Sequence, residues 1–340
     1  MEMTPKKRAL LCLTGNKWKA DRVTAFDPLT TATVDQMMAV KAPFPDAHRD
    51  PELMAKLAAA AWEVIGLEGF KIPFDLCIQA EALGAEIHYG ALDIHPSVRK
   101  PAFKELEEFK LPEGILDRGR FPVVEGAVEK LREKYGDYLP ISRQVVGPFT
   151  IAGHIFGVEK FCGWIKRRDP EELREVLFQL ADLNVEEARA ALRAGADVIC
   201  IADPTASSDI ISPQTFKELM VPTYQRLCSR VSAPVVLHIC GNATSYLPYL
   251  PDTGIDTFSC DAQVDIAFAK QVLGNRVAVA GNVPTVSVLL QGNPETVKKA
   301  CIECIAKGTD MLIPSCGIPP RTPTENFRIL PQVASCMVYV

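Results

Sequence analysis

A histidine, a cysteine two positions later and a distant second cysteine are the residues of this sequence best suited to chemistry. His238 and Cys240 follow the apolar run 234–237, and Cys316 follows a second apolar run, 311–314. Side chains alternate along a strand, so positions 238 and 240 face the same way, and a third ligand from another strand end completes three corners of a tetrahedron. One imidazole and two thiolates suit Zn²⁺, and three protein ligands with one open position are typical of catalytic zinc. The alternative is a core histidine beside buried cysteines.

The elements that must position these residues follow from eight apolar runs of strand length, most of them followed by a turn signal and an amphipathic helical stretch. The runs are 22–26, 69–74, 141–146, 197–202, 234–239, 257–259, 277–280 and 311–314. Several intervening stretches begin with a capping residue and then proline, as at Thr4, Asp169, Ser212 and Asn293. This alternation predicts a (β/α)8 barrel, an α/β fold, as a single domain over residues 1–340.

Two segments depart from the repeat. Residues 1–20 are expected to form an N-terminal helical extension of the barrel. Residues 84–139 are too long for an ordinary connection, are charged and contain several prolines, and are expected to form an inserted hairpin and helix over the barrel mouth.

Composition excludes several classes of protein. The chain has 340 residues, 48% of them hydrophobic, and a net charge of -5 with the charges mixed along the sequence. No basic stripe is interleaved with aromatic residues, so nucleic acid is not an expected partner. No apolar run reaches the ~18 residues of a membrane helix, and the N-terminal apolar stretch is too short for a signal peptide, so a cytoplasmic protein is expected. Eleven scattered cysteines then indicate reduced thiols and metal ligation rather than a disulfide framework.

The residues that end the predicted strands favour the metal site over the core interpretation. In a barrel of this kind the chemistry lies at the carboxyl ends of the strands, and His238, Cys240 and Cys316 all fall there. Most of the other cysteines lie elsewhere along strands and helices. The pair Cys301 and Cys304 spells C-x-x-C, but it lies inside the helical stretch 295–307 and is interpreted as core rather than as a redox pair.

At this point the chain resembles a known family. The segments that carry the resemblance are 8–10 with 21–23, 74–75 leading to 81–84, 146–150, 203–213 and 280–283, and they look like the uroporphyrinogen decarboxylase superfamily. Within it, His238, Cys240 and Cys316 match the methylcobamide:coenzyme M methyltransferases of methylotrophic methanogens, whereas true decarboxylases lack the zinc cysteines. The resemblance implies a zinc enzyme that moves a methyl group from a methylated corrinoid protein to the thiol of coenzyme M (2-mercaptoethanesulfonate), in methanogenesis from methylated C1 compounds.

Such a reaction suits the residues, because a metal-bound thiol is deprotonated and the thiolate is the nucleophile. Within the enzyme class, another thiol or a folate-type carrier is an alternative acceptor. The rival from another class is a non-catalytic corrinoid-binding barrel. The sequence does not choose the corrinoid protein or the methylated growth substrate.

Other polar residues at the strand ends are weaker candidates for the site. Asp261 is interpreted either as a labile fourth zinc ligand or as a carboxylate that hydrogen-bonds a neighbouring loop or His238. Asp75 and Asp203 are expected to orient loops or zinc ligands rather than to bind zinc themselves, and both are candidates for contact with the substrate. His154 is expected near the mouth, with capping or packing as its alternative. Asn282 is expected in a turn whose amide lines the pocket, with a simple turn as the alternative. The anionic end of the thiol is expected to meet Arg143 or the helix N-terminus that follows residue 147. The candidates for substrate binding are therefore Asp75, Arg143, His154, Asp203 and Asn282.

Overall fold

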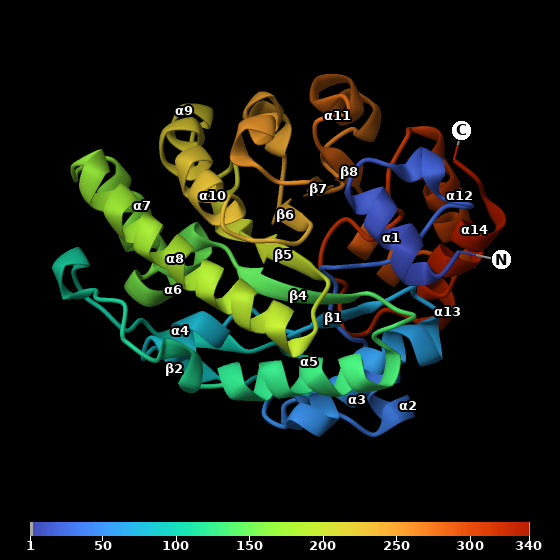
Figure 1. Cartoon of the computed structure of the whole chain (residues 1–340), viewed down its shortest axis with the longest axis horizontal. Helices are drawn as coiled ribbons and strands as arrows, with labels where there is room; N and C mark the ends of the chain where they lie inside the picture. The colour runs from blue at the N-terminus through green and yellow to red at the C-terminus, as the bar shows by residue number, and fades with distance from the viewer. Residues whose placement is uncertain (1–2, 340) are drawn as a thin grey trace.

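The computed structural model describes residues 3–339 and contains a parallel sheet surrounded by helices (Figure 1). The sheet has six strands in the order β1-β4-β5-β6-β7-β8, and every neighbouring pair is parallel. The strands are β1 Phe70–Ile72, β4 Ile141–Val146, β5 Val198–Ala202, β6 Val235–Ile239, β7 Thr257–Cys260 and β8 Ala278–Ala280. Each lies within a predicted run or extends it by one residue, which is consistent with the predicted (β/α)8 barrel.

The first and eighth predicted strands close the barrel as extended segments rather than as regular strands. Leu312 donates its backbone N–H to the Thr24 carbonyl oxygen at 3.1 Å, and Met311 bridges to Ala280 on β8. The segment around Thr24 lacks a full ladder because side chains take its donors. The Thr24 N–H points to the Tyr339 hydroxyl oxygen and the Ala25 N–H to a Glu68 carboxylate oxygen.

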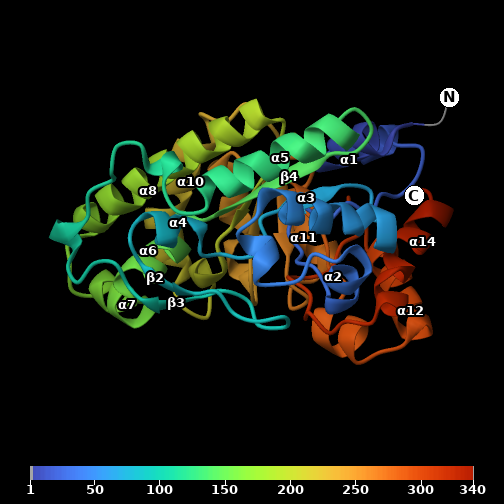
Figure 2. The same cartoon turned by 90° about the horizontal axis from the view of Figure 1, so that it is seen from below.

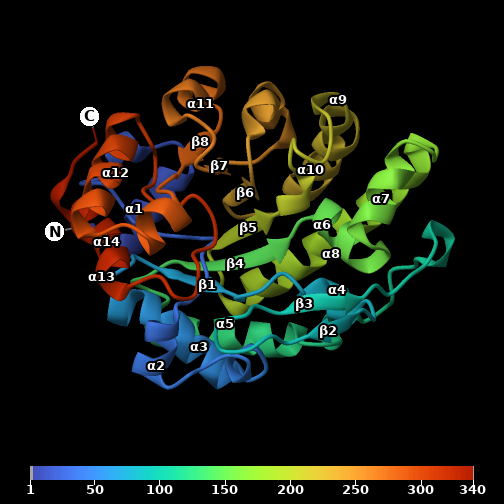
Figure 3. The ribbon, with the colours of Figure 1, turned by 180° about the vertical axis from the view of Figure 1, so that it is seen from behind.

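Helices cover the outside of the sheet and connect its strands (Figures 1 and 3). The predicted caps are confirmed, since the side chains of Thr4, Asp169, Ser212 and Asn293 each accept a backbone N–H at the start of a helix whose first residue is proline. The α-helices are α1 Pro5–Leu13, α2 Val34–Val40, α3 Pro51–Ala60, α4 Ile78–Ala82, α5 Phe121–Tyr135, α6 Pro148–Phe156, α7 Val158–Ile165, α8 Pro170–Ala194, α9 Pro213–Thr215, α10 Val221–Cys228, α11 Ile266–Leu273, α12 Pro294–Ala306, α13 Thr324–Phe327 and α14 Ile329–Cys336.

Helix α1 forms the predicted N-terminal extension, of which residues 1 and 2 lie outside the described residues. Its buried Cys12 and Leu13 belong to the same apolar cluster as Val198 and Val236 from the barrel interior. The Leu13 carbonyl oxygen accepts a hydrogen bond from the Thr257 hydroxyl at the start of β7. The extension therefore covers the amino ends of the strands, opposite the end where the predicted site lies.

The predicted insertion divides into two parts with different positions. Strands β2 Glu86–His88 and β3 Ser97–Lys100 form an antiparallel hairpin, and residues 95–98 from its loop and second strand line a pocket at the carboxyl end of the barrel. The helical part is a correction to the expectation, because α5 packs outside the barrel against α3 and α8 rather than over the mouth (Figure 2). Its apolar residues, such as Val124 and Leu131, are buried in that helical layer.

The single-domain organisation over residues 1–340 stays a prediction. Residue 340, like residues 1 and 2, lies outside the described part. Within residues 3–339, no helix has both the length and the apolar character needed to cross a membrane.

Candidate metal centre and pocket

The three predicted metal ligands come together at the carboxyl end of the barrel. His238 is the fourth residue of β6, Cys240 follows that strand, and Cys316 lies just after the extended segment 311–314. His238 Nε2 lies 3.3 Å from Cys240 Sγ, and Cys240 Sγ lies 3.5 Å from Cys316 Sγ. Their potential ligand atoms all lie within 4.8 Å of one another. We refer to His238, Cys240 and Cys316 as the ligand cluster.

The imidazole of His238 is held in the orientation that a metal ligand needs. Its Nδ1 lies 3.1 Å from the Ser259 carbonyl oxygen and 3.2 Å from the Ser259 hydroxyl, on the neighbouring strand β7. When Nδ1 carries the ring proton and donates it to this carbonyl oxygen, Nε2 is left unprotonated. Its lone pair then faces the cysteines and is free to bind a metal. The side chain is buried, so the backbone of β7 fixes both the tautomer and the ring position.

The two cysteines form a pair that gives up a proton easily. A hydrogen bond from the Cys240 thiol, and the neighbouring His238 ring, lower the pKa of Cys316 to about 4, although burial opposes this shift. The same hydrogen bond raises the pKa of Cys240. One of the two sulfurs is therefore a thiolate at neutral pH, which is the form that binds metal.

The donor set fits zinc. At Zn–S bonds of about 2.3 Å, two sulfurs of a tetrahedron lie about 3.8 Å apart, close to the observed 3.5 Å between Cys240 and Cys316. One nitrogen and two sulfurs are borderline-soft ligands that suit zinc better than magnesium or calcium. The three-ligand set also leaves a coordination position for substrate or a further ligand.

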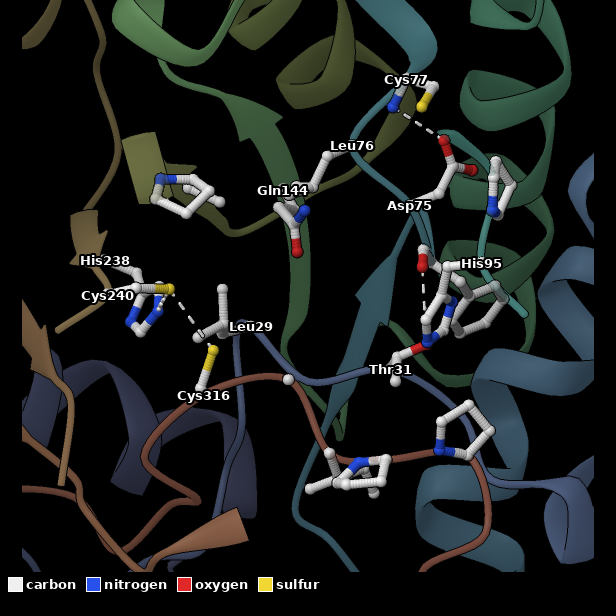
Figure 4. A pocket seen from close by; sticks show the side chains of 18 of the residues that line it. Leu29, Thr31, Asp75, Leu76, Cys77, His95, Gln144, His238, Cys240 and Cys316 are labelled. Carbon is white, nitrogen blue, oxygen red and sulfur yellow. Dashed lines mark hydrogen bonds between the residues drawn. The ribbon is translucent and has the colours of Figure 1, made fainter. Parts of the chain in front are cut away.

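A pocket of about 470 Å³ opens beside the ligand cluster, and His238, Cys240 and Cys316 form part of its wall. Figure 4 shows the cluster on one side of this pocket, Asp75 and His95 on the other, and Gln144 between them. Most other lining side chains are apolar, among them Leu29, Phe74, Leu76, Val98, Val286 and Ile318. A small, largely apolar cavity beside the cluster is suited to a short substrate from which water is displaced.

Two of the predicted substrate residues, Asp75 and His154, line this pocket. The Asp75 carboxylate is occupied by protein partners, since it accepts two hydrogen bonds from Arg120, at 2.8 and 3.1 Å, and one from the Cys77 N–H. Burial acts to raise the pKa of Asp75, but Arg120 and His48 hold it well below its usual range. Asp75 thus anchors the loop after β1 to the start of α5, in line with the expected loop-orienting role. His154 is partly buried, its buried Nδ1 has no hydrogen-bond partner among the described residues, and desolvation lowers its pKa.

Asp203 caps helix α6 rather than lining the pocket. Its carboxylate accepts the backbone N–H groups of Phe149 and Thr150, at 3.2 and 2.7 Å, and the hydroxyls of Thr150 and Tyr224. Burial raises the pKa of Asp203 to about 6, although these hydrogen bonds act in the opposite direction. A Cβ at Gly147 would lie 2.3 Å from this carboxyl group, so the close approach requires glycine there. The helix N-terminus that was a candidate for the substrate anion is therefore already occupied by a carboxylate.

Arg143 does not reach the pocket, which corrects the expectation that it meets the substrate anion. It alternates with Ser142 and Gln144 on β4, and its side chain is fully buried in the layer between sheet and helices. Its guanidinium lies 2.7 Å from Glu187 of α8 and 3.2 Å from Glu125 of α5. Both predicted partners for a substrate anion are thus engaged elsewhere.

Asp261 and Asn282 lie in the loops beside the ligand cluster. Asp261 Oδ1 accepts the Gln263 N–H at 3.0 Å, and no oxygen of Asp261 falls within the group of atoms able to share a metal. The Asn282 amide donates to the carbonyl oxygens of Asp261 and Val264, at 2.9 and 2.8 Å, and so ties the loop after β8 to the loop after β7. Neither side chain lines the pocket. A labile fourth-ligand role for Asp261 stays a prediction.

Among the pocket residues that sequence reasoning missed are Lys71, His95 and Gln144. Lys71 carried a usable signal, because a lysine in the middle of the short buried strand β1 has to point somewhere that tolerates charge. His95 lies in the hairpin loop and Gln144 on β4, where nothing in the local pattern marks them. The expected C-x-x-C pair behaves as predicted, since Cys301 and Cys304 are free, buried thiols in α12.

The fold and this site have clear counterparts among known proteins. Residues 24–335 match the uroporphyrinogen decarboxylase (URO-D) family. The methylated-thiol–coenzyme M methyltransferase of Methanosarcina mazei is 38% identical over 327 residues, covering 96% of this chain and 88% of that protein. The methylcobamide:CoM methyltransferase MtaA of Methanosarcina barkeri is 38% identical over 336 residues, covering 97% of each. A solved methyltransferase structure from Methanosarcina mazei has a TM-score of 0.94 at 37% identity, covering 98% of this chain and 99% of that one.

The chain therefore belongs to the uroporphyrinogen decarboxylase family. Within that family it is a methyltransferase, because the relatives that match nearly its whole length at 38% identity are methyltransferases that act with coenzyme M. These findings confirm the predicted family, the barrel fold and the enzyme class.

Proposed function

We propose that this protein is a zinc-dependent methyltransferase that moves a methyl group from a methylated corrinoid protein to the thiol of coenzyme M. The observation that carries the proposal is the ligand cluster, in which one imidazole and two thiols converge on an apolar pocket. The relatives' names support the acceptor more firmly than the donor, since both contain coenzyme M but one names a methylated thiol and the other a methylcobamide.

His238, Cys240 and Cys316 would hold the zinc, which, when bound, supplies a positive centre that keeps the substrate thiol deprotonated at neutral pH. The protein's own residues position the ligands and the substrate. Ser259 holds the His238 ring in position, and the apolar lining removes water from the short substrate. In the reaction the substrate sulfur loses its proton to solvent and forms a bond to the methyl carbon. The cobalt–carbon bond breaks, and its electron pair stays on the cobalt of the donor.

The donor has to approach at the barrel mouth, because the pocket beside the ligand cluster lies at the carboxyl ends of the strands and α1 covers the other end. The hairpin β2–β3, whose residues 95–98 line the pocket, belongs to this surface. Cross-links between the two proteins are expected to map to these loops, and cross-links mainly to α1 would contradict the docking mode.

The test is methyl transfer from free methylcobalamin to a panel of thiols, followed by the cobalt absorption spectrum and by zinc analysis of the same sample. We expect about one zinc per chain and transfer to coenzyme M that disappears in a zinc-free preparation and returns when zinc is added. Wild-type transfer by a fully zinc-free preparation would exclude the zinc mechanism. Failure to transfer to any thiol, with zinc bound, would favour the non-catalytic corrinoid-binding barrel.

A further inference from the structure

A thiol substrate with an anionic end needs a cation inside the pocket, and this inference rests on the proposed function. Two candidates suggested by sequence are engaged with protein carboxylates, Arg143 with Glu187 and the N-terminus of α6 with Asp203. The Arg120 guanidinium is likewise engaged, with Asp75 and Glu81. The cation that binds the anionic end of the substrate therefore has to be another residue of the pocket.

Lys71 is a buried cation that lines the pocket. It is the middle residue of β1, only 6% exposed, and pairs in register with Ser142 on β4. Gln144 is two residues further along β4 and so extends from the same face, and it too lines the pocket. Among the described residues, no carboxylate lies within 4.0 Å of the Lys71 ammonium and no hydrogen bond from it is formed; its Nζ lies over the Phe74 ring, 5.9 Å from the ring centroid.

Within the described residues, the charged groups around the pocket form no direct ion pair with Lys71, and Asp27 acts on it only from beyond ion-pair distance. Asp75 is neutralised by Arg120. Burial, together with the charge of Lys71, lowers the pKa of His95 to about 4, and burial lowers that of His154, so both rings are neutral at pH 7. Burial also lowers the pKa of Lys71, to about 8, which leaves it mostly protonated at pH 7. A buried, unpaired ammonium is unfavourable, and an anionic ligand removes that penalty.

Asp27 is the protein group that competes for this role. Its Oδ1 accepts the N–H groups of Leu29 and Thr30, at 3.0 and 3.1 Å, while its Oδ2 is buried without a partner. Asp27 and Lys71 both line a second void of about 20 Å³, which is close to the space of one water molecule. Lys71 therefore borders a small void shared with Asp27 on one side and the substrate pocket on the other.

We propose that Lys71, assisted by the Gln144 amide, binds the anionic group of the short thiol substrate, while the thiol end reaches the ligand cluster. Figure 4 shows Gln144 extending into the space between the cluster and Asp75, as such a bridging position requires. Because Lys71 belongs to a barrel strand and is almost fully buried, it suits a small sulfonate, carboxylate or phosphate and not a bulky donor that stays at the mouth.

The experiment pairs a change in the enzyme with a change in the substrate. Wild type and Lys71→Met are compared with 2-mercaptoethanesulfonate and with 2-mercaptoethanol, which has the same thiol and no anion, with methylcobalamin as the donor. We expect the variant to lose about 10- to 100-fold in kcat/KM for the sulfonate, mainly through KM, and less than about threefold for the alcohol. Lys56→Met, which removes an exposed lysine on α3, serves as the control with equal net charge and should change neither value.

Equal losses for the two thiols would overturn the proposal and assign Lys71 a general structural role. If neither thiol is methylated by the wild type, the proposed function itself fails, and the two failures are thus distinguished. Should Lys71→Met not fold, Lys71→Gln takes its place, and protection of the wild type against thermal unfolding by ethanesulfonate but not by ethanol gives a second measurement. Ethanesulfonate without any effect on the wild type would also overturn the proposal.

Discussion

Two buried cations on neighbouring strands, Arg143 on β4 and Lys71 on β1, have opposite surroundings. Arg143 faces the helices and is paired with Glu187 and Glu125. Lys71 faces the barrel interior, where no described carboxylate lies within ion-pair distance, and borders the pocket. Charged side chains between the sheet and the helices are paired with each other. In the barrel interior near the mouth, by contrast, Lys71 has no ion-pair partner among the described residues and can bind an anionic ligand. This difference separates structural from functional polar groups better than residue type does.

The cysteines divide in the same way. Cys301 and Cys304 are buried in α12, where burial raises the pKa of each thiol, so both stay protonated. Cys240 and Cys316 lie at the mouth, half-buried, with the pKa of Cys316 lowered by the Cys240 hydrogen bond. Thiols of the same intrinsic chemistry are thus packed, protonated side chains in one layer and candidate metal ligands in the other.

Removing a ligand from the cluster should have the largest effect. His238→Ala, Cys240→Ala and Cys316→Ala are each expected to lose zinc and to reduce methyl transfer below about one-thousandth of the wild-type rate, because the thiol is no longer activated. The fold should survive, since the large apolar core does not depend on the metal. Metal analysis, the transfer assay and circular dichroism check this. Cys304→Ala is the matched control and should keep its zinc.

Breaking the ion pairs of Arg143 between the sheet and the helices should lower the stability of the fold without changing the ligand cluster or the pocket. Arg143→Met removes the ion-pair partner of the buried Glu187 and leaves it only the neutral Gln79 amide as a donor, so we expect the free energy of unfolding to fall by about 3–5 kcal/mol. Zinc content and the KM for coenzyme M should stay unchanged in the folded variant. Urea denaturation at pH 7, with steady-state kinetics under native conditions, measures both. A weaker thiol affinity at unchanged stability would return Arg143 to the list of substrate residues.

The interior carboxylate Asp27 should make stability depend on pH. Burial raises its pKa to about 6, above an unfolded value of about 3.9, so the native state binds its proton more tightly. The stability from this group is complete below about pH 4 and is lost as pH rises through 6. Asp27→Asn keeps the Oδ1 acceptor and removes the titration, so its stability relative to wild type should rise by on the order of 2–3 kcal/mol between pH 4 and pH 7. Parallel curves of unfolding free energy for the two proteins would contradict the shift.

The smallest expected effect is at the loop beside the cluster. Asp261→Ala should retain zinc, because His238, Cys240 and Cys316 are unchanged, and should alter thiol affinity or rate by about tenfold or less. In the wild type, zinc X-ray absorption should gain one sulfur neighbour when the thiol is added, with release of about one proton. An unchanged sulfur count at saturating thiol would make the zinc structural, and loss of zinc from Asp261→Ala would make Asp261 a permanent ligand.

Several parts of the molecule could be predicted from the sequence because they depend on short-range rules. Side-chain alternation placed His238 and Cys240 on one face, and apolar runs with proline-marked helix starts gave the barrel and its caps at Thr4, Asp169 and Asn293. Soft ligand types at strand ends then indicated zinc. These inferences needed only the local chemistry of a few residues and the direction of a parallel strand.

The use of each charged residue was decided by the tertiary structure alone. Whether Arg143 faces helices or substrate depends on the strand register and on Glu187, more than forty positions away in the chain. Asp203 occupies a helix N-terminus that the sequence left open, and the segment around Thr24 gives its backbone donors to Glu68 and Tyr339 instead of a ladder. Such pairings join residues distant in sequence, and burial makes every unpaired charge costly. Only the folded chain therefore shows that Lys71, within residues 3–339, is a buried cation without a carboxylate in ion-pair distance, its Nζ lying instead over the Phe74 ring.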